Sequence, residues 1–226
     1  MRFNTTLLHG NKMGDVNTGA TLTPVYQSSA FYQPSAEQHE KLFHNKATGF
    51  SYTRINNPTI FAFEERMTTL EGGLASVACA SGMAAITNAL LNIVTCGQEI
   101  VASTSLYGGS IDVFHDFEAF GIKTVFVDIS DVNAVEAAIN ENTRVIFAET
   151  IGNPKLDVVD IEALAELAHR HDLPLVMDNT VATAYLVKPI EKGADIVVNS
   201  TSKYINGNSN AISGVITVSY THLRAH

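Results

Sequence analysis

From Asn57 onward, short apolar runs alternate with segments whose apolar residues recur at helical spacing. The apolar runs predict strands at residues 75–79, 99–103, 123–127, 144–148, 174–177, 195–198 and 212–218. The helical spacing predicts helices over 82–94, 131–140 and 160–171. Strands that alternate with helices are typical of an α/β fold, with a mostly parallel seven-stranded sheet and helices on both faces.

The segment before the first strand also carries helix signals. Asn57 can cap a helix, Pro58 suits its first position, and Gly72-Gly73 suits its end, so we expect a helix over 58–71. Residues 1–48 are polar and lack periodicity, which predicts an extended N-terminal arm. Residues 49–218 are then one domain, and 219–226 form a tail that does not continue its pattern.

Composition narrows the classes of function. The chain has 226 residues, 46% of them hydrophobic, and a formal net charge of −9, which argues against nucleic acid or an anionic membrane surface as a partner. Cys79 and Cys96 lie in apolar surroundings without a CxxC motif, so we expect buried free thiols, no metal site and a cytoplasmic location. We also expect neither a signal peptide nor a membrane span.

Polar and glycine residues follow five of the predicted strands, at 80–83, 105–109, 149–154, 178–180 and 199–204. Open parallel sheets bind ligands where their strands end, so we expect one shared site there. The sequence has no GxxxxGK[ST], no GxGxxG after the first strand and no GxSxG. These absences disfavour a P-loop enzyme, a dinucleotide-binding fold and an α/β-hydrolase.

Two residues, Asp178 and Lys203, are candidates for chemistry at this site. Asp178 ends an apolar strand, where a carboxylate needs a partner such as a protonated pyridine nitrogen, although a helix cap or a structural salt bridge would also serve. Lys203 follows a buried strand, where a crowded apolar setting would lower the pKa of its amine and let it attack an aldehyde. A surface lysine is the alternative.

Other residues suit a flat, phosphorylated ligand. The hydroxyls and backbone amides that could hold a phosphate, or else act as caps and turns, belong to Ser81, Gly82, Met83, Ser200 and Ser202. The ring of Tyr107 could stack on the ligand or only pack against protein, and Arg54 could bind phosphate or only solvent.

Six segments together resemble the Cys/Met-metabolism family of pyridoxal-phosphate (PLP) enzymes over roughly residues 10–218. They are YTRINNPT, ASGMAAI, SLYGG, ETIGNPKLDV, DNTVAT and NSTSKYINGNSNAISG, in the family's order and spacing. The resemblance implies the large domain of the aspartate aminotransferase-like fold, called fold type I, with pyridoxal 5'-phosphate as cofactor.

The same resemblance assigns roles to individual residues. Lys203 is the Schiff-base lysine, Asp178 pairs with the pyridine nitrogen, and Tyr107 stacks on the ring. The cofactor phosphate is held by Ser81, Gly82, Met83, Ser200 and Ser202. Tyr52 and Arg54 reach the phosphate of a neighbouring subunit's cofactor, and Asn153 lies near the ring hydroxyl and the substrate carboxylate. A homodimer or a dimer of dimers with shared sites follows.

Within the family, the segments most resemble members that replace the γ-acetoxy group of O-acetyl-L-homoserine with sulfide in methionine and cysteine biosynthesis. Cystathionine γ-synthase and methionine γ-lyase activities stay open. The family also has a small C-terminal domain that this sequence does not supply, so we expect the chain alone to be poorly active. An inactive fragment that keeps the cofactor fold is a further alternative. Departures from residues common in relatives occur at Val181, Asn208, Asn210 and Ser213.

Overall fold

The computed structural model describes residues 2–10, 15 and 18–220, and it divides into two units, residues 1–66 and 67–226. Helix α3 (Pro58–Glu71) runs across this division. The predicted tail, 219–226, lies outside the described residues except for Ser219 and Tyr220. In the described part of the chain, no helix is long and apolar enough to cross a membrane.

The first unit contains two helices, α1 (Phe3–His9) and α2 (Ala36–Phe43), where the sequence predicted only an extended arm. Ser35 begins α2 by accepting a hydrogen bond from the backbone amide of Gln38, a capping signal that the prediction missed. Elsewhere, a bridge pairs Ala30 with Tyr52. The predicted boundary at residue 48 therefore cuts through segments that bond to each other.

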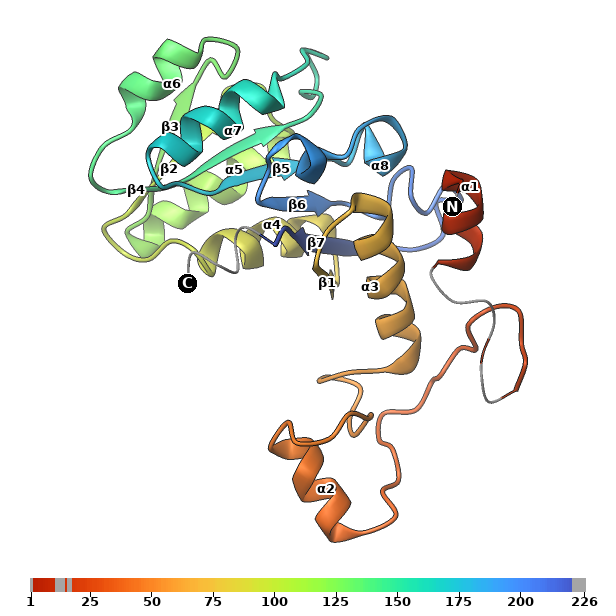
Figure 1. Cartoon of the computed structure of the whole chain (residues 1–226). Coiled ribbons are helices and arrows are strands. Elements are labelled where there is room, and N and C mark those ends of the chain that lie inside the picture. The colour runs from red at the N-terminus through yellow and green to blue at the C-terminus, as the bar shows by residue number, and fades with distance from the viewer. Residues whose placement is uncertain (1, 11–14, 16–17, 221–226) are drawn as a thin grey trace. The chain divides into compact units, whose positions relative to one another are not determined.

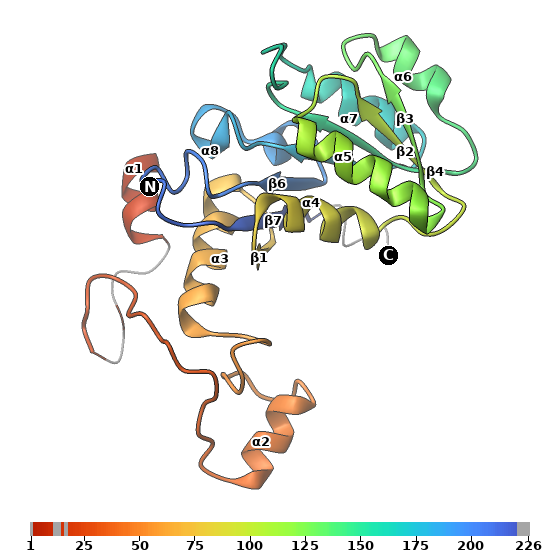
Figure 2. The ribbon, with the colours of Figure 1, turned by 180° about the vertical axis from the view of Figure 1, so that it is seen from behind.

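The second unit is built on a seven-stranded sheet with the order β1-β7-β6-β5-β4-β2-β3 (Figures 1 and 2). β7 runs antiparallel to both of its neighbours, and the other pairs are parallel. The strands are β1 (Ala75–Cys79), β2 (Glu99–Ser103), β3 (Lys123–Val127), β4 (Thr143–Glu149), β5 (Leu175–Asp178), β6 (Ile196–Asn199) and β7 (Gly214–Val218). All seven predicted strands are confirmed, with ends that differ by at most two residues.

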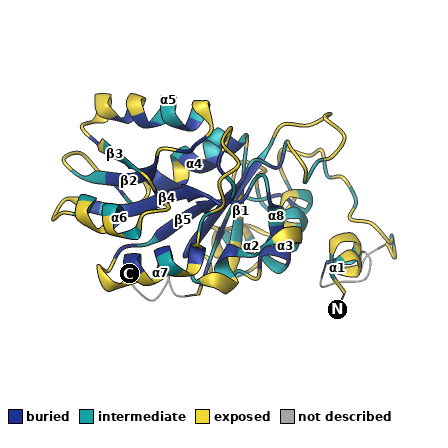
Figure 3. Cartoon of the chain, turned by 90° about the horizontal axis from the view of Figure 1, so that it is seen from above, coloured by how far each residue is buried: buried dark blue, intermediate teal, exposed yellow. Residues whose placement is uncertain are grey.

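Helices cover both faces of this sheet, as predicted. One apolar cluster joins α4 (Gly82–Leu91) and α5 (Gly108–Asp116) to the strands, and a second joins α6 (Val132–Ala138) and α7 (Ile161–Arg170) to the opposite face. Figure 3 shows the buried strands between these two helical layers. The remaining short elements are α8 (Thr183–Leu186) and the 3-10 helices η1 (Phe117–Phe120) and η2 (Pro189–Lys192).

Two features differ from the prediction. Helix α5 was not expected, because it opens with two glycines and buries only Ser110 and Phe114. The two cysteines are free, but Cys79 is half-buried and Cys96 is exposed, so the prediction of buried thiols is wrong. Cys96 lies in the turn between α4 and β2, where the chain passes over the surface.

The order of connections creates an opening at one edge of the sheet. β2 and β4 are hydrogen-bonded neighbours, yet β2 leads into α5 on one face and β4 leads toward α7 on the other. The segments that leave these two strands therefore diverge. A crevice at such a switch point is the usual ligand site of an open α/β sheet.

Candidate functional site

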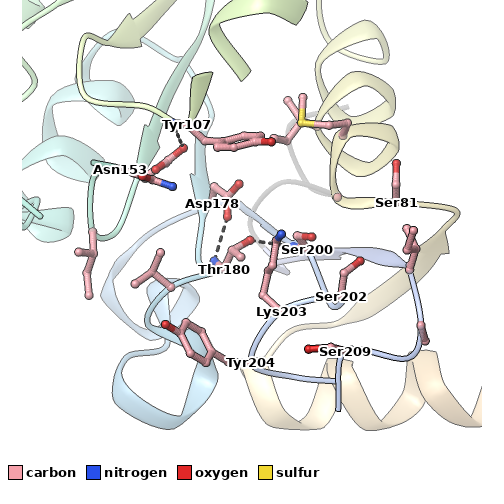
Figure 4. Close-up of a pocket in the computed structure, with 18 of the residues that line it drawn as sticks. Ser81, Tyr107, Asn153, Asp178, Thr180, Ser200, Ser202, Lys203, Tyr204 and Ser209 are labelled. Carbon is pink, nitrogen blue, oxygen red and sulfur yellow. Dashed lines mark hydrogen bonds between the residues drawn. The ribbon is translucent and has the colours of Figure 1, made fainter. Parts of the chain in front are cut away.

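A cavity of about 870 Å³ lies at the ends of β2, β4, β5 and β6. Its wall includes all nine of the predicted site residues that belong to the second unit: Ser81, Gly82, Met83, Tyr107, Asn153, Asp178, Ser200, Ser202 and Lys203. Figure 4 shows the side chain of Lys203 directed toward the region beside Asp178 and Thr180, with the ring of Tyr107 across from it. The fold thus gathers residues from five separate segments around one space.

Asp178 is the last residue of β5 and is buried at the cavity wall. Burial raises the pKa of its carboxyl, although hydrogen bonds with the hydroxyl and the amide of Thr180 oppose that rise. The Thr180 amide lies 2.9 Å from Asp178 Oδ1. Among the described residues, no cation lies close enough to form an ion pair with this carboxylate. A cationic ring nitrogen in the cavity would stabilise its charged form.

Thr180 connects the aspartate to the lysine-bearing segment. Its hydroxyl accepts a hydrogen bond from the backbone amide of Ser200 at 2.7 Å, while its own amide bonds to Asp178 (Figure 4). The ends of β5 and β6 are therefore fixed to each other through one side chain. Sequence reasoning missed this role, and the only signal was the position of Thr180 just past a strand end.

Lys203 lies in a turn after β6 and contributes to the cavity wall. The sequence led us to expect an amine in a crowded apolar place, and that expectation is wrong, because the residue is exposed. The turn carries it beyond the buried end of β6, where Asn199 is fully buried and Ser200 only partly so. An exposed amine on a cavity wall is accessible to a ligand aldehyde.

Helix α4 points its N-terminus at the same cavity. The hydroxyl of Ser81 caps the helix by accepting a hydrogen bond from the amide of Ala84 at 3.0 Å. The amides of Gly82 and Met83 are among the first four of the helix and have no intrahelical partner. Together with the helix dipole, they form an anion-binding position, as predicted for a phosphate.

Glycine at position 82 is required by a close approach. A Cβ there would lie 2.4 Å from Cβ and 2.7 Å from Oγ of Ser200. The start of α4 and the turn after β6 can therefore meet only because residue 82 lacks a side chain. This contact brings the predicted phosphate-binding groups of both segments together.

Ser202 lines the cavity, but its hydroxyl already has partners. It donates to the carbonyl oxygen of Ser213 at 3.1 Å and accepts from the Ser213 amide at 3.0 Å. Thr201 Oγ1 lies 2.5 Å from Ser213 Oγ. Ser213, one of the four positions noted above as departures, thus anchors the turn on which Lys203 lies.

Tyr107 is held at the cavity by Glu149, which the sequence analysis placed at a strand end without a role. Glu149 Oε1 accepts a hydrogen bond from the Tyr107 amide at 2.7 Å. Glu149 is buried and pairs in register with Asp178. Burial, reinforced by the charges of Asp178 and Asp157, raises the pKa of Glu149 to about 8, although the Tyr107 and Asn153 amides oppose the rise.

Tyr52 and Arg54 belong to the first unit, and their proposed phosphate contact stays a prediction. Within that unit both are exposed, and the Arg54 guanidinium lies 5.5 Å from the centroid of the Tyr52 ring. This cation–π contact keeps a planar cation and an aromatic ring close together. The Arg54 cation and the Tyr52 ring are therefore exposed next to each other.

Pyridoxal phosphate fits the groups that the cavity offers. The helix start and the hydroxyls of Ser81 and Ser200 suit its phosphate, the buried Asp178 suits its ring nitrogen, and the exposed Lys203 suits its aldehyde. The volume lies within the ordinary range for small-molecule sites, so a cofactor and a small substrate can share it. Tyr107 offers an aromatic face on the same wall.

Comparison with known proteins agrees with this fit. O-acetyl-L-homoserine sulfhydrylases from Leptospira meyeri and Corynebacterium glutamicum are 46% and 44% identical to the chain over 94% and 95% of its length. An L-methionine gamma-lyase from Fusobacterium nucleatum is 42% identical over 94% of the chain. The chain covers 48%, 49% and 54% of these relatives, so it spans about half of their length.

Solved structures of related enzymes are also similar to this chain. A Campylobacter jejuni protein described as an O-acetylhomoserine (thiol)-lyase, crystallised with pyridoxyl-lysine monophosphate, has a TM-score of 0.95 and 33% identity, and the match covers 100% of this chain and 56% of that one. Cystathionine gamma-lyase from Lactobacillus plantarum, in complex with L-serine, has a TM-score of 0.90 and 39% identity over 99% of this chain and 56% of that one. Residues 4–226 match the family described as Cys/Met metabolism PLP-dependent enzymes. The chain belongs to that family.

Proposed function

We propose that this chain is the cofactor-binding part of an enzyme that exchanges the γ-acetoxy group of O-acetyl-L-homoserine for sulfide. The products are L-homocysteine and acetate. The observation that carries the proposal is the convergence of Lys203, Asp178 and Tyr107 on one cavity. The similarity to two O-acetyl-L-homoserine sulfhydrylases supports this choice of substrate.

Asp178 and Lys203 have separate roles in the proposed reaction. Pyridoxal phosphate, when bound, supplies an aldehyde and an electron-withdrawing ring. Asp178 favours the protonated form of the ring nitrogen, which strengthens that withdrawal. Lys203 Nζ would be free once the amino group of the substrate takes its place; it would then remove the proton from Cα, pass that proton to the bound cofactor and so become able to remove one from Cβ. Acetate leaves from Cγ, hydrosulfide adds there, and the protons return to carbon.

Tyr107 and the serines position the reacting groups. The Tyr107 ring stacks on the cofactor and its hydroxyl serves as an acid or base, while Glu149 fixes its backbone. The start of α4 and the turn after β6 bind the phosphate, so the ring stays at a constant distance from Lys203. Asn153 contacts the ring hydroxyl and the substrate carboxylate.

We further propose that two subunits share each site, in a homodimer or a dimer of dimers. Arg54 and Tyr52 then bind the phosphate of the partner subunit's cofactor. The exposed Arg54 guanidinium, held near the Tyr52 ring, supports this role because a planar fork of donors suits a phosphate.

A methionine γ-lyase or a cystathionine enzyme is the second candidate, favoured by the 42% identity to an L-methionine gamma-lyase. The test uses a polypeptide that contains this chain and has the length of its relatives, loaded with PLP. We expect homocysteine from O-acetylhomoserine and sulfide at a higher kcat/KM than methanethiol from methionine or cystathionine from O-acetylhomoserine and cysteine. The reverse order of kcat/KM would contradict the proposal and favour the second candidate.

A further inference from the structure

A buried carboxyl lies beneath the site, outside the cavity wall. Glu71 is the last residue of α3 and is completely buried. Its Oε1 accepts a hydrogen bond at 2.8 Å from Nδ2 of Asn199, which is also completely buried. Asn179, another buried residue, interacts with the same carboxyl through its side chain. Three polar side chains from α3, β6 and the segment after β5 thus form one buried cluster.

The hydrogen-bonding balance of this cluster shows which form of the acid fits. Within the described residues, Glu71 Oε2, Asn179 Oδ1 and Asn199 Oδ1 are buried oxygens without a hydrogen-bond partner. If Glu71 is ionised, all three are acceptors and none can satisfy another. If Glu71 is protonated, the cluster gains one donor. Unsatisfied buried groups are costly, so the neutral acid fits better.

The electrostatics agree with this conclusion. Burial raises the pKa of Glu71 to about 7, while the hydrogen bond from Asn199, the neighbouring side chain of Asn179 and the charge of Lys188 act in the opposite direction. Lys188 also forms a 2.8 Å ion pair with Glu191, which holds part of its charge away from Glu71.

The two asparagines adjoin the residues that carry the chemistry. Asn179 lies between Asp178 and Thr180, and Asn199 immediately precedes Ser200 in the segment that leads to Lys203. Asn179 is further fixed by donating to the carbonyl oxygen of Val187 at 3.0 Å. A change at Glu71 therefore reaches the ends of both β5 and β6 without touching the cavity.

We propose that Glu71 is a positioning residue that ties Asn179 to Asn199 and so sets the spacing between Asp178 and the Lys203 segment for pyridoxal phosphate. The inference rests on the PLP site of the proposed function and is independent of which amino acid is the substrate. We therefore expect the affinity for PLP to fall as Glu71 ionises. Cofactor binding then depends on a group that never contacts the cofactor.

The test measures the Kd of the purified chain for PLP by absorbance across pH 6 to 8.5. Glu71→Gln keeps a neutral side chain with a donor and an acceptor. We expect its Kd to stay within about twofold of the unsubstituted chain at pH 6 and to lack the part of the weakening that accompanies ionisation above pH 7. Glu71→Leu removes the hydrogen bond with Asn199 and the interaction with Asn179, and we expect its Kd to rise at least tenfold. The control is Glu162→Gln, which loses only an exposed ion pair with Lys192.

The outcomes separate this inference from the proposed function. If the unsubstituted chain binds no PLP, the proposed function fails, and the positioning role fails with it. If that chain binds PLP and Glu71→Gln keeps the same pH profile, only the positioning role is refuted. Should Glu71→Leu fail to fold, the Glu71→Gln pH profile alone decides. A Glu71→Leu chain that folds and binds PLP with unchanged affinity also overturns the inference.

Discussion

The contact between Gly82 and Ser200 allows a quantitative test of how the site is assembled. In Gly82→Ala the new methyl group would lie 2.4 Å from Ser200 Cβ and 2.9 Å from its Cα, whereas ordinary contacts begin at 3.4 Å. Neither atom belongs to a flexible side-chain end, so the start of α4 and the turn after β6 must move apart by about 1 Å. Overpacking of this kind costs roughly 1–3 kcal/mol.

The magnitude can be read in two assays. Denaturant unfolding of the cofactor-free chain should give a free energy of unfolding lower by about 1–3 kcal/mol, which corresponds to roughly 2–12 °C in Tm for a chain of this size. Titration with PLP should show weaker binding, because the two separated segments both supply phosphate-binding groups. Loss of stability and loss of affinity should therefore occur together.

Gly108→Ala is the matched control. Gly108 is also the first residue of a helix, so alanine changes helix propensity in the same way, but no atom lies within 4 Å of its added Cβ. We expect its free energy of unfolding to change by less than about 0.5 kcal/mol. If both variants lose the same stability, or neither loses any, the close approach at Gly82 does not constrain the site as we reason.

Three further predictions concern charge and assembly. Asp178→Asn should still bind PLP through the phosphate contacts but lose about 10²–10³-fold in activity, and near-normal kcat with bound cofactor would contradict the pairing with the ring nitrogen. Because burial raises the pKa of Glu149 from 4.5 to about 8, its neutral form stabilises the fold at low pH, and this contribution to the free energy of unfolding should decline as the pH rises from about 4.5 to about 8. Glu149→Gln should flatten that decline in a denaturation series, and an unchanged slope would refute the assignment. Mixing Arg54→Ala with Lys203→Ala subunits should restore some activity, since a hybrid dimer contains one intact site, and no recovery despite proven subunit exchange would argue against shared sites.

The sheet was predictable from the sequence because its strands are short apolar runs, and the central strands β2, β4, β5 and β6 are buried along nearly their whole length. β1, β2 and β3 have the bounds of the apolar runs at 75–79, 99–103 and 123–127. The last residue of β5 was equally clear, since Asp178 is the first charged residue after an apolar run. The strand ends then brought the expected residues together, because parallel strands that share a sheet end at one edge.

The contacts that join these segments were not predictable. Glu71 has the sequence pattern of an ordinary acidic residue at a helix end, and only the fold places it against Asn199. Thr180 likewise gains its role from the pairing of β5 with β6. The exposure of Lys203 depends on how far the turn after β6 extends, and the apolar residues nearby do not predict that length. The Glu71 and Thr180 features are tertiary contacts between residues distant in sequence.

The covalent attachment point of the cofactor decides whether this cavity is the PLP site. The chain is loaded with PLP, reduced with borohydride and digested, and its peptides are mapped for the pyridoxyl label. We predict the label on Lys203, within the segment NSTSKY, and no specific label in Lys203→Ala. A pyridoxyl group on any other lysine, with Lys203 unmodified, would contradict the assignment of this cavity as the PLP site.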